Sequence, residues 1–129
     1  MLLPDMATVL VVEDNPANMT LATFLLKSAG YAVLSATDAE AGMALARREQ
    51  PDLVLMDIQL PGMDGLQACA FLKADEATRD IPVIALTALA MKGDEERIRA
   101  AGCDGYIAKP LAYREFLATI AARLQRTAV

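Results

Sequence analysis

Five polar side chains with useful chemistry each stand directly after an apolar run of this 129-residue chain. VLVV precedes Glu13 and Asp14, LVLM precedes Asp57, VIAL precedes Thr87 and YIA precedes Lys109. A strand inside a parallel sheet has no face in solvent, so it reads as a continuous apolar run. In open sheets of this kind, reactive groups collect beyond the carboxyl ends of the strands. We therefore expect three carboxylates, a hydroxyl and an ammonium to meet at one rim.

The three acids predict a cation site. Carboxylates that share a site repel each other and resist ionising together. Such clusters are tolerated mainly where a hard cation neutralises them, and oxygen ligands suit Mg²⁺ or Mn²⁺. An alternative interpretation treats Glu13 and Asp14 as ordinary solvated carboxylates. Asp57 differs because it stands alone at the end of a buried strand, before a loop rich in glycine and proline.

Thr87 and Lys109 complete a set suited to phosphoryl chemistry. A cation, an ammonium and a hydroxyl donor around one carboxylate supply charge neutralisation, oxygen stabilisation and a positioned nucleophile. Taken singly, Thr87 is more often an ordinary strand-end residue and Lys109 a surface charge. Taken together, at the ends of four strands of one sheet, they favour a site that receives a phosphoryl group.

The elements that must position these residues alternate regularly along the chain. Strands are predicted at about 8–13, 31–36, 53–56, 83–86 and 105–108. Helices are predicted at about 15–29, 37–49, 66–74 and 94–101. A last helix carries Phe116, Leu117, Ile120 and Leu124 on its inner face. This (βα)5 alternation predicts an α/β fold with a doubly wound, five-stranded parallel sheet. For this sheet we expect the flavodoxin-like order 2-1-3-4-5, one of the common orders of doubly wound folds. Helices are expected on both faces.

Two helix starts carry local signals. Asn15 followed by Pro16 has the form of an N-cap with proline at the first helical position. The helix after it is expected to bury Met19, Ala22, Leu26 and Ala29 on one face. Thr37 to Glu40 has the form of a capping box that begins the second helix.

Length and composition limit the function classes. We expect a single domain over residues 1–129, with a core at about 8–126 and no output domain. The net charge of −5, without a Lys/Arg cluster, argues against nucleic-acid binding. No apolar stretch approaches about 18 residues and no positive leader is present, so neither membrane insertion nor export is expected. Cys69 and Cys103 lack metal-site spacing and suit reduced packing thiols in the cytoplasm.

The chain contains no histidine. Histidine-based acid–base catalysis, histidine metal ligands and a phosphohistidine intermediate on this chain are therefore excluded. Ser-His-Asp and Cys-His nucleophile pairs are excluded for the same reason.

At these residues the chain resembles the receiver domains of two-component response regulators, over essentially its whole length. The matching segments are VLVVEDN (9–15), LVLMDIQLPGMDG (53–65), VIALTA (83–88) and GYIAKP (105–110). Within the family the chain looks most like stand-alone receivers of the DivK type, through MDIQLPG, ALAMKGDEERIR (88–99) and GCDGYIAKP (102–110). EDNPAN (13–18) is similar to receivers of hybrid histidine kinases as well.

The resemblance implies a role for each residue of the set. Asp57 would be the phosphoacceptor, and Mg²⁺ would be held by Glu13, Asp14, Asp57 and the backbone carbonyl of Gln59. Thr87 and Lys109 would bind the phosphoryl oxygens. The first acid departs from the pattern, because aspartate is commoner there than Glu13.

Further roles concern the conformational response to phosphorylation and the lifetime of the phosphorylated state. Lys109-Pro110 would be a cis peptide, and Tyr106 occupies the switching aromatic position, although a half-packed strand residue is an equal interpretation. Gln59 and Leu89 fall on the positions that tune dephosphorylation, and we expect slow self-hydrolysis because Leu89 cannot orient a water.

We expect a phosphorylation-dependent signalling module rather than an enzyme. The module would catalyse only its own phosphorylation and its own slow dephosphorylation. Its phosphoryl donor would be a sensor histidine kinase or a histidine phosphotransfer protein. Its output would be a downstream protein bound on the face of helix 4, strand 5 and helix 5, where the chain places Met91, Lys92, Glu95, Arg99, Tyr106 and Tyr113.

Four alternatives stand beside it. An aspartate-nucleophile phosphohydrolase would use the same rim, but that class needs a second acid two residues after the nucleophile, where Gln59 stands. A flavodoxin-like cofactor binder would need a glycine-rich phosphate loop after the first strand, which this chain lacks. A receiver fragment of a hybrid histidine kinase and a degenerate receiver that acts as a static scaffold are the others.

Overall fold

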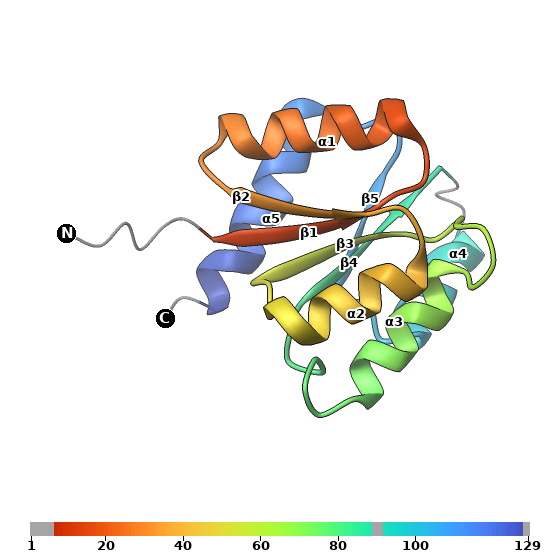
Figure 1. The fold of residues 1–129 in the computed structure, drawn as a ribbon. Helices are drawn as coiled ribbons and strands as arrows, with labels where there is room; N and C mark the ends of the chain where they lie inside the picture. The colour runs from red at the N-terminus through yellow and green to blue at the C-terminus, as the bar shows by residue number, and fades with distance from the viewer. Residues whose placement is uncertain (1–6, 89–91, 128–129) are drawn as a thin grey trace.

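The computed structural model describes residues 7–88 and 92–127. Its strands form one parallel sheet in the order β2-β1-β3-β4-β5 (Figure 1). The strands are β1 (Thr8–Val12), β2 (Ala32–Ala36), β3 (Leu53–Asp57), β4 (Val83–Thr87) and β5 (Gly105–Ala108). The predicted α/β fold class and strand order are confirmed.

The helices cover both faces of this sheet. They are α1 (Pro16–Ser28), α2 (Ala39–Glu49), α3 (Gly65–Ala74), α4 (Lys92–Ala100) and α5 (Tyr113–Thr127). α1 and α5 lie on one face, and α2, α3 and α4 lie on the other (Figure 1). None of the helices in these two ranges combines the length and apolar character needed to cross a membrane.

Neighbouring residues of the central strands are buried against opposite helix layers. Val9 and Val11 of β1 pack in the cluster that contains Phe116 of α5, whereas Leu10 and Val12 pack in the cluster that contains Leu72 of α3. Because successive side chains of a strand point to opposite faces, burial of both faces requires every residue to be apolar. This is the physical reason for the continuous apolar runs in the sequence.

Two details of α1 and α2 differ from the predictions. On α1, Leu25 is buried. Ala29, which was expected to be buried, is exposed at the C-cap because the helix ends at Ser28. The N-cap of α2 is Asp38, whose side chain accepts a hydrogen bond from Ala41 N at 2.8 Å. The capping box predicted from Thr37 to Glu40 is therefore wrong by one residue.

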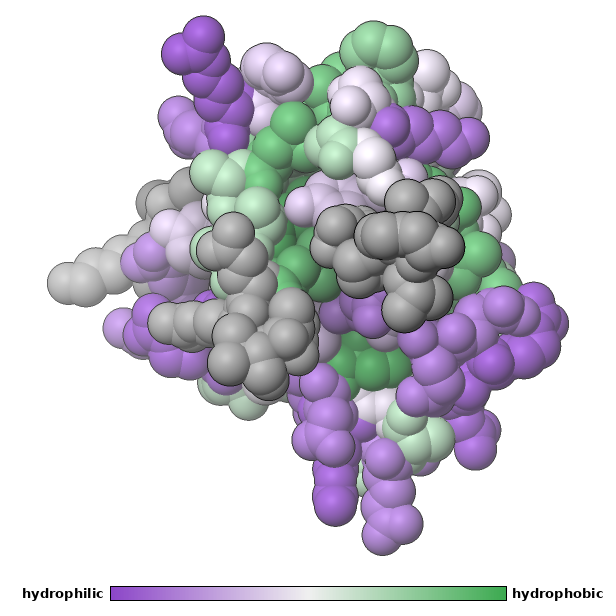
Figure 2. Space-filling view, turned by 90° about the vertical axis from the view of Figure 1, so that its left-hand side faces the viewer, coloured by the Kyte–Doolittle hydropathy of each residue, from purple (hydrophilic) through white to green (hydrophobic). Residues whose placement is uncertain are grey.

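The strands all run toward one end of the molecule, at the right of Figure 1. Figure 2 looks onto the opposite end, where hydrophilic side chains form most of the rim and hydrophobic ones lie between them. The polar strand-end residues lie at the end away from this view.

Candidate functional site

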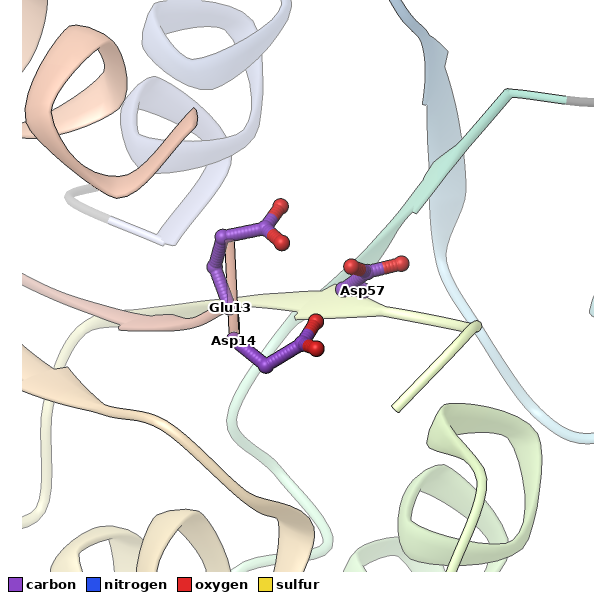
Figure 3. Close-up of side chains that lie close together, drawn as sticks. All are labelled: Glu13, Asp14 and Asp57. Atoms are coloured by element: carbon purple, nitrogen blue, oxygen red, sulfur yellow. The ribbon is translucent and has the colours of Figure 1, made fainter. Parts of the chain in front are cut away.

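The register of the sheet brings the acids together. Val12 of β1 pairs with Met56 of β3, so the next residues, Glu13 and Asp57, lie side by side where the strands end. Oxygen atoms of Glu13, Asp14 and Asp57 all lie within 4.8 Å of one another, and the three carboxylates point toward one region (Figure 3). Glu13 and Asp57 are buried, whereas Asp14 is exposed.

Lys109 brings a positive charge into this cluster from the end of β5. Its Nζ lies 3.0 Å from Asp57 Oδ2 and 2.8 Å from Glu13 Oε1. Its backbone N–H donates to Thr87 O at 2.8 Å, which holds the lysine beside the end of β4. The Lys109–Pro110 peptide bond is cis, the isomer that the resemblance implies. Lysine and acids thus meet although Lys109 and Asp57 are 52 positions apart in the sequence.

Each oxygen of Asp57 has its own donor. Lys109 binds Oδ2, and the backbone N–H of Gln59 donates to Oδ1 at 2.9 Å. These two contacts fix the plane of the carboxylate, and Asp57 is only 3% exposed. The side chain is therefore oriented before any ligand arrives.

The electrostatics of Glu13 and Lys109 reflect burial and their mutual contact. Burial, followed by the neighbouring Asp57, raises the pKa of Glu13, although Lys109 opposes the shift. Burial lowers the pKa of Lys109, but the contacts with Glu13 and Asp57 outweigh it, so the pKa is raised overall. The lysine is therefore a permanent cation at neutral pH.

The donor set fits a divalent cation. Glu13 Oε1 is buried 2.8 Å from the Lys109 ammonium and has no other hydrogen-bond partner among the described residues, so it keeps acceptor capacity for a further ligand. One ammonium shared by Glu13 and Asp57 leaves excess negative charge in the cluster. With Asp14 and Asp57 nearby, the cluster offers the oxygen-only ligands that Mg²⁺ prefers.

The remaining predicted residues lie around this centre. Thr87 is buried at the end of β4, directly after Leu86, which pairs with Asp57. Gln59 is exposed in the loop after β3. Tyr106 lies on β5, and its hydroxyl donates a hydrogen bond to Glu95 of α4. Leu89 and Met91 lie outside the described residues.

Sequence reasoning missed two contacts of α3, one at its start near the site and one further along it. The α3 N-cap is Asp64, which forms a capping box with Gln67, and this spacing of acid and glutamine was readable in the sequence. The Sγ atoms of Cys69 and Cys103 lie 3.1 Å apart. Nothing local in the sequence signals that contact, because the two residues are 34 positions apart.

Solved structures with the same architecture are response regulators and receivers. A putative response regulator from Chloroflexus aurantiacus superposes with a TM-score of 0.89 at 28% identity, over 92% of this chain and 98% of the other. The receiver domain of sensor histidine kinase PA1611 from Pseudomonas aeruginosa, solved with a magnesium ion coordinated in its active-site cleft, gives a TM-score of 0.86 at 38% identity over the same shares. The fold and its acidic edge thus define the class of phosphorelay signalling domains.

The sequence comparisons narrow this class. Residues 9–121 match the response regulator receiver domain. The polar-differentiation response regulator DivK of Brucella ovis is 50% identical over 113 residues, which span 88% of this chain and 92% of that protein. The chain belongs to the response regulator receiver domain family, and it is a two-component signalling domain similar to DivK.

Proposed function

We propose that Asp57 accepts a phosphoryl group from a phosphohistidine on a sensor histidine kinase or a histidine phosphotransfer protein, with Mg²⁺ bound beside it. The observation that carries the proposal is the contact of Lys109 Nζ with Asp57 Oδ2 at 3.0 Å within a cluster of three acids. A buried carboxylate with a fixed cation on one oxygen is arranged for attack and charge stabilisation. The chain has no histidine, so the donor must be another molecule.

In the transfer, an Asp57 oxygen forms the new P–O bond while the P–N bond of the donor breaks and the imidazole leaves. The backbone N–H of Gln59 fixes the orientation of the attacking carboxylate. Lys109 and the Thr87 hydroxyl receive the phosphoryl oxygens. Glu13, Asp14, Asp57 and the Gln59 carbonyl would hold Mg²⁺, which supplies neutralisation of the charge that accumulates on those oxygens.

Phosphorylation adds up to about two negative charges where Lys109 and Thr87 can respond. When Lys109 and Thr87 move toward the phosphoryl oxygens, β4 and β5 carry the change to the α4–β5–α5 face. Tyr106 and Glu95, which are hydrogen-bonded on that face, are placed to report it. We propose that a downstream protein binds there, in the cytoplasm.

The alternative hydrolase function is less well supported. That chemistry needs an acid to protonate the leaving group two residues after the nucleophile, and the side-chain amide of Gln59 is not an acid that can do this. The static-scaffold alternative is disfavoured because the acids and the lysine stand in contact. We therefore propose a phosphoacceptor that turns over slowly, not an enzyme acting on other substrates.

The test is phosphorylation by acetyl phosphate, followed by intact mass spectrometry. With Mg²⁺, the wild-type chain should gain one phosphoryl group, and EDTA should prevent the gain. Asp57→Asn should remain unmodified, whereas Asp64→Asn, a control in the same loop that retains a capping side chain, should behave as wild type. Unimpaired phosphorylation of Asp57→Asn, or sustained release of phosphate from a phosphomonoester, would refute the proposal.

A further inference from the structure

The two cysteines of the chain meet in the folded protein. Cys69 lies on α3 and Cys103 lies in the turn between α4 and β5, and the Cys103 thiol donates to Cys69 Sγ at 3.1 Å. Both are free thiols. Two sulfur atoms at this separation need to approach by only about 1 Å to reach disulfide bonding distance.

The neighbouring residues hold the two segments in place. Lys73, one turn beyond Cys69 on α3, forms an ion pair at 2.8 Å with Asp104, the residue after Cys103. Lys73 Nζ also donates to Ile81 O at 2.8 Å. On the other side, the backbone N–H of Cys103 donates to Ile98 O, which closes the turn after α4. The sulfur contact is thus supported from both sides by polar contacts of adjacent residues.

The two thiols differ in access and in protonation. Cys69 is fully buried, whereas Cys103 is partly exposed. The hydrogen bond from Cys103, assisted by the charge of Lys73, lowers the pKa of Cys69 although burial opposes it. The same hydrogen bond raises the pKa of Cys103. Loss of one proton from the pair leaves a thiolate on Cys69 that accepts the remaining S–H of Cys103, and the thiolate is the form that reacts with an oxidant.

We propose that Cys69 and Cys103 form a redox-active pair that a hydroperoxide converts into an intramolecular disulfide in the folded receiver. With hydrogen peroxide, one sulfur attacks the O–O bond to give a sulfenic acid and one water. The second sulfur then displaces the hydroxyl group, which forms the S–S bond and releases a second water. The two thiols lose two electrons and two protons in total, and the peroxide is reduced.

The disulfide would join α3 to the start of β5. Asp104, next to Cys103, hydrogen-bonds to Val83 at the start of β4, and Thr87 stands four residues further along that strand. At about 3.3 Å per residue, the pair lies roughly 13 Å along the sheet from the phosphoryl edge. Oxidation therefore leaves the acids in place and restrains the α4–β5 turn, and it does not depend on the proposed role of Asp57.

The test uses the full chain, reduced and then treated with hydrogen peroxide without denaturant. Intact mass and peptide mapping should find one disulfide between Cys69 and Cys103 in monomeric protein, with the reduced mass restored by dithiothreitol. Closing a 34-residue separation should also raise the melting temperature by about 5 °C or more. Thiols that stay reduced, disulfide-linked dimers, or sulfinic acid without a disulfide would each overturn the proposal.

Two variants provide matched controls. Cys103→Ser and Cys69→Ala each remove one sulfur, so neither should form the intramolecular disulfide or gain thermal stability after treatment. Differential alkylation of the wild-type protein before and after oxidation gives the same answer without any variant. If peroxide also raised the melting temperature of Cys103→Ser, the rise in the wild-type protein would not come from the cysteine pair.

Discussion

At the scale of single residues, the site is a balance of buried charges. Glu13 and Asp57 are almost completely buried next to each other, and Lys109 is the cation that contacts both. One lysine cannot neutralise three acids, so the cluster carries excess negative charge that a divalent cation is suited to offset. Protonation of Glu13 is therefore expected to weaken metal binding at this cluster.

The first prediction concerns that link. Folding raises the pKa of Glu13 above its value in the unfolded chain, 4.5. Such a carboxyl stabilises the folded protein at pH values below the unfolded pKa, and this contribution is lost as the pH rises through the folded pKa. Mg²⁺ needs the ionised form, so it should raise the melting temperature more at about pH 7.5 than at about pH 5. Differential scanning fluorimetry with Mg²⁺ or EDTA measures this. In Glu13→Gln, the rise in melting temperature caused by Mg²⁺ should depend less on pH. An equal rise at both pH values in the wild-type protein would contradict the prediction.

The second prediction concerns Lys109. Lys109→Ala should fold, but without metal it should lose about 1–3 kcal/mol of unfolding free energy, because Glu13 and Asp57 lose their buried cation. Its melting temperature should also respond less to beryllofluoride with Mg²⁺ than that of wild type. Urea titration and thermal melts test both effects, and Lys27→Ala, an exposed lysine on α1, is the control. A wild-type response to beryllofluoride would remove Lys109 from the phosphoryl contacts.

The sequence was sufficient to predict that the acids and Lys109 lie together, but not every contact between side chains. Asp57 and Lys109 were predictable because the end of each apolar run marks the same edge of a parallel sheet. The contact of Cys69 with Cys103 was not, since it depends on how α3 packs against the turn after α4. Tertiary packing of helices leaves no local signal of this kind.

At the scale of elements, the start of α3 controls how β3 presents its aspartate. Gly65 is the first residue of α3, and a Cβ there would lie 2.0 Å from the backbone oxygen of Asp57. Its N–H donates to Ile58 O, so the helix begins directly against the loop that leaves the site. Only glycine permits this approach of two backbone segments.

The third prediction follows from that approach. Gly65→Ala should lower the unfolding free energy by about 2–4 kcal/mol, because backbone atoms cannot move aside as a flexible side chain can. It should also slow phosphorylation at Asp57. Gly93→Ala on α4 is the matched control, since nothing lies within 4 Å of its added carbon, and it should change stability by less than about 1 kcal/mol. Equal urea midpoints for Gly65→Ala and wild type would refute the assignment.

Element boundaries show what local sequence can and cannot determine. The strand positions were predictable to within one residue. For β3 and β4 the reason is that burial on both faces leaves no polar residue inside the run. The cap of α2 was misplaced because Thr37 and Asp38 are both good N-caps, and the choice depends on where the chain leaves β2. The start of α4 at Lys92, two residues earlier than expected, carries no sequence signal that we recognise.

At the scale of the whole molecule, the sheet connects the edge that carries the acids with the α4–β5–α5 face. Thr87 pairs with Ala108, the residue before Lys109, so the two residues proposed to contact the phosphoryl oxygens belong to the β4–β5 strand pair. Tyr106 lies on the same strand and donates its hydroxyl proton toward Glu95 on α4. A displacement of β5 is therefore expected to change this hydrogen bond.

The fourth prediction uses that hydrogen bond as a reporter. Hydrogen bonding to Glu95 raises the pKa of the Tyr106 phenol above 10, so any stability that the contact gives is present below pH 10 and is lost as the pH rises through the folded value. Glu95→Ala should lower this pKa, whereas Glu96→Ala on the same helix should not. Titration of carbon-13 labelled tyrosine by NMR, with and without beryllofluoride and Mg²⁺, measures the change. An unaltered titration in the bound state would mean that Tyr106 takes no part in the switch.

The proposed transfer bonds the phosphoryl group to one carboxylate, that of Asp57. Reduction with borohydride after phosphorylation converts an acyl phosphate of aspartate into homoserine, which peptide mass spectrometry locates in the chain. We expect homoserine at position 57 alone, and only when Mg²⁺ and the phosphoryl donor were both present. Homoserine at position 14 or 64, or none at position 57 in fully phosphorylated protein, would contradict it.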